Sequence, residues 1–426
     1  MAIMSATVRY ALHTTTLGNG LRVIVNPDPS VPVVALNIWY DVGSRDEQPG
    51  RTGLAHLFEH LMFEGSAQVA AGEHLAAIQG VGGSANATTW FDRTNYFETV
   101  PTTALDLALW LEADRLASLR LTQHTLDNQR EVVLEEKRQR YDNVPYGDVI
   151  LHLVELTFPK HHPYGHATIG SMDDLAAAAL DDVRRFFATH YAPNNAVLSL
   201  VGDVDPEDAF AKVAATLGTV PSAPVAARAT SAVLPPLSGM PRRDVSANVP
   251  TEALYATWRL PARDTRDFDA AELGLAILGD GQTSRLHRRL VRTDRIAEGA
   301  GASALGLIGG NSIGFVQARA LAGVTAEQLE DAIVDELARF ATQGPTEAEV
   351  DRVKAQYERS WLADLSRLDT RADLFSAYAT LHDDPEAVNR RFDEVRSVTP
   401  DEIARAARER LRPDQLAVLS YRKDPA

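Results

Sequence analysis

Two histidines and a glutamate lie close together near the start of the chain, in the order His56, Glu59, His60. Because an α-helix turns once every 3.6 residues, a step of four places both imidazoles on one side of a helix. There they could hold one zinc ion, which lowers the pKa of a bound water toward about 7. Glu59 could take the proton of that water as it attacks a peptide carbonyl. The spacing therefore predicts metal-dependent peptide hydrolysis with Glu59 as general base.

The order H-x-x-E-H reverses the usual H-E-x-x-H and is the inverzincin signature. With 12 histidines in 426 residues, it should arise by chance in roughly two such sequences in a hundred. The alternative is an exposed helix face that happens to carry these residues. Apolar residues at spacings of three and four argue against it, since they predict a buried opposite face. These residues are Leu54, Leu57, Phe58, Leu61 and Met62. We expect a helix of about three turns, with Thr52 as N-cap and a stop at Gly65.

A third metal ligand should be a carboxylate, because the chain has no cysteine and so no thiolate. The acidic helix expected at residues 126–141 offers Glu131, Glu135 and Glu136. Spacing does not choose among the three. Each could instead be a solvated partner of a neighbouring arginine or lysine, which is the commoner role of such residues.

The chain of 426 residues is long enough for at least two domains. A stretch rich in Pro, Ala and Ser predicts a linker at 221–243, between an N-terminal peptidase domain at 1–220 and a C-terminal domain at 244–426. The strand and helix patterns of the first half recur in the second, which indicates a duplicated unit. We expect an α+β protein made of two homologous α/β sandwich domains.

Composition excludes several partners. The net charge of −16 disfavours nucleic acid and anionic membrane surfaces, both of which reward basic patches. No run of about eighteen apolar residues predicts a membrane span, and the first residues lack the pattern of an export signal. The sequence thus predicts a cytoplasmic protein that binds neither nucleic acid nor membrane.

Further motifs extend along almost the whole chain. They are Gly53–Ser66, Gly83–Thr89, Arg130–Glu136, His162–Gly165, Tyr191–Asn195 and Val201–Asp203. Together with the histidine pair, they resemble the pitrilysin-type metallopeptidases. Within that family the chain is similar to mitochondrial processing peptidase and its bacterial two-domain relatives.

This resemblance implies one Zn²⁺ per chain and selects a third ligand. In the family that ligand is a glutamate some seventy-odd residues after the second histidine, and Glu136 follows His60 by 76 residues. Relatives often carry a further glutamate seven residues before the third ligand. Here that position is Gln129, which departs from the pattern.

The resemblance also implies a substrate strand. Asn86, Ala87 and Thr88 match the family's edge strand, which binds an extended peptide by adding it to the sheet. Main-chain hydrogen bonds of this kind give affinity without requiring a particular sequence. The alternative is an ordinary strand with a polar outer face.

The second half departs from the family where relatives supply an arginine and a tyrosine that stabilise the substrate carbonyl. The corresponding positions are Val291 and Glu298, with Arg292 one residue away. No tyrosine occurs between Tyr255 and Tyr357. We therefore expect a homologous partner chain to provide the pair, in a hetero-oligomer or, as a second possibility, a homodimer.

The combined prediction is a zinc metalloendopeptidase that cleaves extended peptides or unfolded segments. The alternative is a non-catalytic structural or assembly subunit of the same family. The complete set of metal ligands and general base favours the enzyme. A second histidine group, His161, His162 and His166, lies in a Pro- and Gly-containing loop without nearby carboxylates, which favours a structural role.

Overall fold

The computed structural model describes residues 9–226, 228 and 231–424. The chain forms two compact units, each assembled from separate segments of the sequence. Of the described residues, unit 1 comprises 9–133, 168–226, 228 and 360–392, and unit 2 comprises 134–167, 231–359 and 393–424. Each unit contains one β-sheet with helices on both faces, which confirms the expected α+β class.

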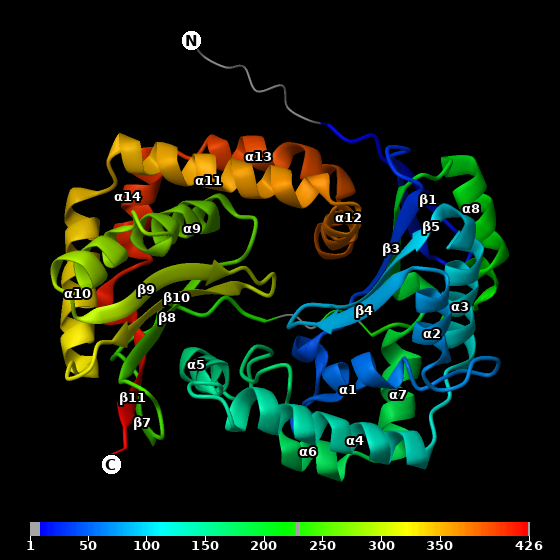
Figure 1. Ribbon diagram of the computed structural model, residues 1–426, viewed down its shortest axis with the longest axis horizontal. Helices are drawn as coiled ribbons and strands as arrows, with labels where there is room; N and C mark the ends of the chain where they lie inside the picture. Colours follow the sequence, from blue (N-terminus) through cyan, green and yellow to red (C-terminus); the bar gives the residue numbers. More distant parts are fainter. Residues whose placement is uncertain (1–8, 227, 229–230, 425–426) are drawn as a thin grey trace. The chain divides into compact units, whose positions relative to one another are not determined.

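The sheet of unit 1 has the strand order β1-β2-β6-β3-β5-β4. Its strands β1, β3, β4 and β5 are labelled in Figure 1. Its strands are β1 (His13–Thr16), β2 (Arg22–Pro27), β3 (Val33–Tyr40), β4 (Ser84–Thr89), β5 (Thr94–Pro101) and β6 (Ala196–Gly202). Strands β2 and β6 are parallel, and the other neighbours are antiparallel. The strand β4 lies at one edge of this sheet.

The sheet of unit 2 has the order β7-β11-β8-β10-β9. Its strands are β7 (Arg242–Ala247), β8 (Ala253–Pro261), β9 (Ala297–Leu305), β10 (Asn311–Ala320) and β11 (Ala417–Lys423). Here β7 and β11 are parallel and the remaining pairs antiparallel. Apart from β1, the two sheets share order and direction, as expected of a duplicated unit.

Helices cover both faces of each sheet. Unit 1 contains α1 (Leu54–Leu61), α2 (Glu73–Gly80), α3 (Leu105–Ser118), α6 (Met172–Ala177), α7 (Leu180–His190), α8 (Pro206–Ala215) and α12 (Leu368–His382). Unit 2 contains α5 (Val149–Thr157), α9 (Arg266–Gly279), α10 (Ala326–Gln343) and α14 (Pro400–Glu409). Three helices continue across a unit boundary: α4 (Gln123–Lys137), α11 (Glu347–Ser366) and α13 (Val388–Arg396).

The alternation of side chains along β3 and β5 separates the two faces of the unit 1 sheet. On one face, Asn37 and Asn95 donate hydrogen bonds to Asp373 of α12. On the other face, Tyr40 and Tyr96 contact each other, with ring centroids 6.0 Å apart. Helix α12 comes from the second half of the sequence, whereas α5, from the first half, packs against the sheet of unit 2.

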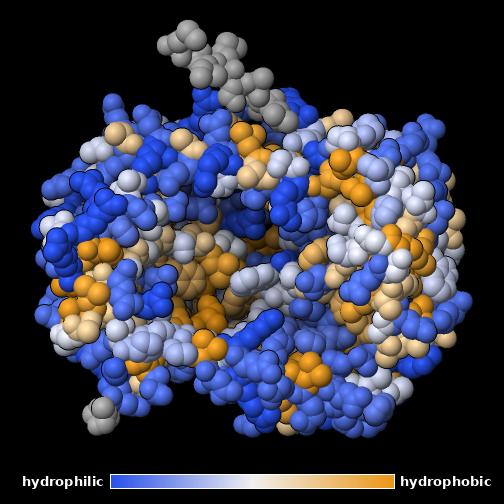
Figure 2. Space-filling model, viewed as in Figure 1, coloured by the Kyte–Doolittle hydropathy of each residue, from blue (hydrophilic) through white to orange (hydrophobic). Residues whose placement is uncertain are grey.

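The face drawn in Figure 2 is largely hydrophilic, with hydrophobic residues in smaller groups. In the part of the chain that the structure describes, no helix is both long and apolar enough to cross a membrane.

Candidate metal centre

Helix α1 starts at a tightly packed glycine. Gly53 has φ +91°, and a Cβ there would lie 2.8 Å from the carbonyl oxygen of Ile169, so only glycine fits without strain. Glu47 accepts hydrogen bonds from the backbone amides of Gly53 (2.8 Å) and Ala55 (2.7 Å). Its carboxylate therefore satisfies amides that a helix start leaves without partners.

Two details of the predicted helix were wrong. Thr52 is not the N-cap, because its hydroxyl donates to Asp174 at 2.7 Å. The helix ends at Leu61 rather than near Gly65, so it has about two turns instead of three. The five predicted apolar residues are all buried. One of them, Phe58, stacks on Phe186 with a centroid distance of 5.1 Å.

The two histidines lie on the side of α1 away from this core. Their ring centroids are 5.0 Å apart, with an angle of 78° between the ring planes. His56 is 9% exposed, whereas Glu59 and His60 are half-buried. Glu59 is also close enough to Tyr191 for its charge to add to the effect of burial, which raises the pKa of that tyrosine. A carboxylate on this accessible side of the helix could reach a water molecule.

The candidate third ligand is on α4, whose earlier turns are fixed to unit 1. The Gln129 amide donates to Glu64 at 2.6 Å, and Arg130 donates to the carbonyl oxygens of Leu175 and Ala178. Because α4 continues without a break to Lys137, these contacts also restrain its last turn. Glu136 lies on that turn.

Burial distinguishes the three glutamates that the sequence left open. Glu131 and Glu135 are exposed, and Glu135 accepts a hydrogen bond from Gln139 at 2.8 Å. Glu136 is half-buried and forms an ion pair with the exposed Arg140 at 2.6 Å. The structure thus separates Glu136 from its two acidic neighbours.

One ligand atom from each of His56, His60 and Glu136 lies within 4.8 Å of the other two. Two imidazoles and one glutamate are a donor set that zinc uses in catalytic sites, where a fourth position stays open for water or substrate. The residues present therefore fit a zinc ion. Arg140 could pair with a carboxylate oxygen that does not face the metal.

The predicted substrate residues lie on the edge strand β4. Asn86 is exposed, and its side-chain oxygen accepts a hydrogen bond from the Ala87 amide at 2.8 Å. Ala87 is buried, and the Thr88 hydroxyl donates to Asn95 of β5 at 2.6 Å. On its other side β4 pairs with no strand among the described residues. An added strand could bind there if it displaced the Asn86 side chain.

The positions expected to contribute an arginine and a tyrosine lie in unit 2. Val291 is half-buried against the core of that unit, and Glu298 is exposed on β9. A valine side chain has no hydrogen-bond donor, and an ionised glutamate only accepts hydrogen bonds. Neither residue can therefore donate to a substrate carbonyl oxygen. Arg292 is exposed and donates to Gln282 at 3.3 Å.

His162, from the second histidine group, has structural contacts. His162 stacks on Phe158, with centroids 4.8 Å apart, and its Nδ1 accepts from the Tyr164 amide. Burial lowers the pKa of His162, which agrees with a structural role.

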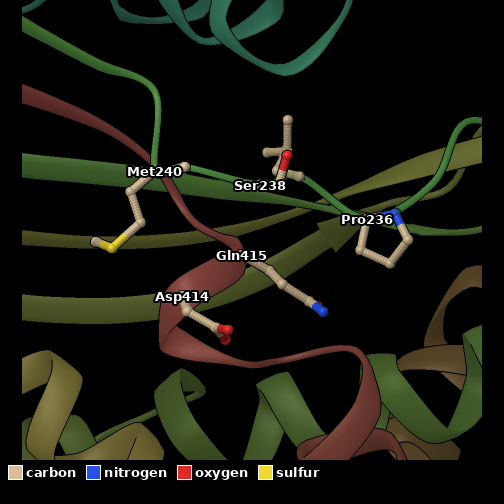
Figure 3. Close-up of a pocket in the computed structure, with 7 residues that line it drawn as sticks. Pro236, Ser238, Met240, Asp414 and Gln415 are labelled. Atoms are coloured by element: carbon tan, nitrogen blue, oxygen red, sulfur yellow. The ribbon is translucent and has the colours of Figure 1, made fainter.

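A cavity of about 610 Å³ in unit 2 is shown in Figure 3. It is lined by Pro236–Met240, Asp414 and Gln415, and contains none of the predicted site residues.

Sequence reasoning missed the residues that hold α1. Glu47 lies in a loop without periodicity, and Tyr96 donates from its hydroxyl to the Phe58 carbonyl at 3.2 Å. No local pattern points to the second contact, because Tyr96 and Phe58 are 38 residues apart and lie on different elements.

The two halves of the chain match two domains of one class of peptidase. Residues 22–171 match the family described as "Insulinase (Peptidase family M16)", and residues 177–357 match "Peptidase M16 inactive domain". The chain therefore belongs to peptidase family M16, as the resemblance in its sequence implied.

Individual relatives agree with this assignment. The chain is 31% identical over 379 residues to "Zinc protease PqqE" of Helicobacter pylori, covering 87% of this chain and 84% of that protein. A "Probable mitochondrial-processing peptidase subunit beta" of Arabidopsis thaliana is 27% identical over 201 residues, or 47% of this chain and 38% of that protein. The crystal structure of a protease from Helicobacter pylori superposes with a TM-score of 0.91 at 28% identity, over 97% of this chain and 100% of that one.

Proposed function

We propose that this chain is a zinc metalloendopeptidase that cleaves extended peptides or unfolded protein segments. The observation that carries this proposal is the position of His56, His60 and Glu136, whose ligand atoms lie within 4.8 Å of one another. Glu59 lies on the same helix as the two histidines and is partly accessible. A relative that is named as a zinc protease supports the same function.

Each residue has a distinct role in this proposal. A zinc ion bound by the three ligands would activate a water and polarise the peptide carbonyl. Glu59 accepts the proton of the attacking water and passes it to the leaving amine. The edge of β4 at Asn86, Ala87 and Thr88 holds the peptide extended, so that one carbonyl faces Glu59.

A homologous partner chain completes the site. It provides the arginine and tyrosine that Val291 and Glu298 cannot replace, and one such donor can contribute about 3 to 4 kcal/mol to transition-state stabilisation. A relative that is named as a subunit supports this arrangement. A cytoplasmic location is also part of the proposal, and fractionation of cells with an antibody to the chain would test it.

The first experiment measures zinc content and cleavage of a quenched peptide library for the wild type and Glu59→Gln. Each is assayed alone and with homologous chains from the same genome. We expect one zinc per chain in both proteins, activity that increases with a partner, and a loss of about 10²- to 10⁴-fold in kcat for Glu59→Gln. Absence of zinc and of cleavage under every condition would favour the non-catalytic subunit instead.

A further inference from the structure

Four ionisable side chains are buried together in unit 1, on the face of the sheet that carries α1. They are His74 of α2, Glu98 of β5, and Glu112 and Arg115 of α3; none is more than 4% exposed. We call these four residues the buried cluster. None of its members was singled out by the sequence motifs, and none belongs to the proposed metal centre.

Hydrogen bonds connect the buried cluster in pairs. His74 Nε2 lies 2.5 Å from a carboxyl oxygen of Glu98. The guanidinium of Arg115 donates two hydrogen bonds to the carboxylate of Glu112, one through Nε at 2.9 Å and one through Nη2. Such a two-pronged pair is the strongest form of a charged hydrogen bond.

Burial explains which members are charged. It raises the pKa of Glu98 to about 7 and lowers the pKa of His74 to about 4. Below neutral pH, Glu98 therefore keeps its proton and donates it to the neutral ring of His74. Burial also raises the pKa of Glu112, and the adjacent guanidinium of Arg115 opposes that rise. Where Glu112 is ionised, its charge and that of Arg115 cancel, which is the condition for burying ions without a large penalty.

The buried cluster is connected to α1 through one tyrosine. Arg115 stacks on the ring of Tyr96, with its Cζ 4.4 Å from the ring centroid. The Tyr96 hydroxyl donates to the backbone carbonyl of Phe58 at 3.2 Å, and lies 3.1 Å from the hydroxyl of Tyr191. Phe58 immediately precedes Glu59, so this bond holds α1 at the residue next to the proposed general base.

We propose that Tyr96 is a positioning residue for the metal centre, and that the buried cluster fixes it through Arg115. Residues outside the coordination sphere that hold ligands in place commonly change metal affinity or activity by 10- to 100-fold when they are removed. This inference rests on the proposed function, because it concerns the same metal centre. It goes further by assigning a role to side chains that contact neither metal nor substrate.

A second metal ion in the buried cluster is the competing explanation. His74, Glu98 and Glu112 offer ligand atoms within 4.8 Å of one another. However, both oxygens of Glu112 already accept hydrogen bonds from Arg115. A cation would be repelled by the guanidinium, so the cluster is a support and not a second metal site.

The test compares Tyr96→Phe with a matched control, Tyr10→Phe. Tyr10 also donates to a helix carbonyl at 3.2 Å, that of Leu365, and Arg371 stacks on its ring at 4.6 Å. Each variant removes the hydroxyl of a tyrosine whose ring stacks against an arginine. We expect Tyr96→Phe to weaken zinc binding in a chelator competition by about 10-fold and to lower kcat about 10-fold at unchanged KM. Tyr10→Phe should leave all three values unchanged.

A second variant tests the link between the buried cluster and Tyr96. Arg115→Lys keeps a positive charge beside Glu112 but removes the planar group that stacks on Tyr96. We expect its zinc affinity to fall by about as much as that of Tyr96→Phe, with one zinc per chain at saturation. Two zinc ions per wild-type chain, one of them lost in His74→Gln, would overturn the inference in favour of a second metal site.

The outcomes separate this inference from the proposed function. Wild-type protein that binds zinc and cleaves peptide, with Tyr96→Phe equal to it in both measurements, would overturn the positioning role alone. Equal losses of zinc affinity in Tyr96→Phe and Tyr10→Phe would also overturn it, since the effect would then be a general loss of stability. Wild-type protein that binds no zinc would overturn both.

Discussion

Apart from β1, unit 1 and unit 2 have the same strand order, but the first α-helix after β3 in unit 1 differs from the first α-helix after β8 in unit 2. In unit 1, α1 is short and carries a histidine pair and a glutamate on its accessible side. In unit 2, α9 is 14 residues long and its buried residues are mostly small or apolar. At its end, Gly279 approaches β9 so closely that a Cβ would lie 1.8 Å from the amide nitrogen of Ala302.

The space beside α9 also differs in chemistry. A cavity of about 500 Å³ is lined there by parts of α5, α9, β8, β9 and β10, and no histidine is among its lining residues. Two copies of one architecture thus offer different side chains at corresponding places. The comparison teaches that the fold places a helix against an edge strand, whereas the residues on that helix decide whether a metal can bind.

The largest expected difference is between Glu136 and its exposed neighbour Glu135. We expect Glu136→Gln to weaken zinc binding by at least about 100-fold, since removing a ligand should exceed the effect of removing its outer support. Glu135→Gln should change neither zinc affinity nor activity. Isothermal titration with zinc checks both variants. Equal affinities of the two would remove Glu136 from the site.

The second prediction concerns Glu98 of β5, which has no counterpart in unit 2. The corresponding strand there, β10, contains neither aspartate nor glutamate. Burial raises the pKa of Glu98 from 4.5 to about 7, so its proton stabilises the fold below pH 4.5 and this contribution is lost as the pH rises to 7. Burial lowers the pKa of His74 from 6.5 to about 4, so its contribution is present above pH 6.5 and lost toward pH 4.

Relative to wild type, Glu98→Gln should therefore gain up to about 3 kcal/mol in free energy of unfolding as the pH rises from 4.5 to 7. His74→Gln should lose up to about 3 kcal/mol as the pH rises from 4 to 6.5. Urea unfolding at several pH values measures both. Differences from wild type that do not vary with pH would show that neither group titrates as described.

A third prediction compares two glycines at helix ends. Gly53→Ala and Gly279→Ala each force a Cβ against backbone atoms, which should lower the free energy of unfolding by about 1 to 3 kcal/mol. Only Gly53→Ala should also weaken zinc binding, because α1 begins there. Thermal unfolding and zinc titration together test this. Weaker zinc binding in Gly279→Ala would mean that the two units are coupled.

The smallest predicted effect concerns helix caps. Glu47→Gln weakens the cap of α1, and Thr265→Ala removes the hydroxyl that accepts from the Phe268 amide at the start of α9. Each should cost about 0.5 to 2 kcal/mol of stability. Zinc affinity should fall for Glu47→Gln alone. If Thr265→Ala had the same effect on zinc, the cap would act through overall stability.

Local patterns were sufficient for much of the fold and of the candidate site. The histidine pair, the buried face of α1 and the duplicated order of strands follow from helical and strand periodicity. The choice of Glu136 needed the family resemblance, because Glu131, Glu135 and Glu136 are equivalent in spacing. Only the fold shows that Glu136 alone approaches the histidines.

Other features could not be predicted because they depend on contacts between distant segments. His74, Glu98 and Glu112 are separated by up to 38 residues and come from three different elements. Each alone resembles an ordinary surface residue. The same applies to Glu47, whose role depends on the path of a loop that has no periodic pattern. The proposed domain division at 221–243 stays a prediction.

The composition of unit 1 has a consequence for the synthesis of the chain. The face of its sheet formed by Ile24, Ala35, Val197 and Val201 is covered by Ala372 and Phe375 of α12. A ribosome must therefore add more than 150 residues after β6 before that apolar face can be covered. Until then the nascent chain exposes it, which creates a window for chaperone binding or aggregation that ends only after α12 has been synthesised.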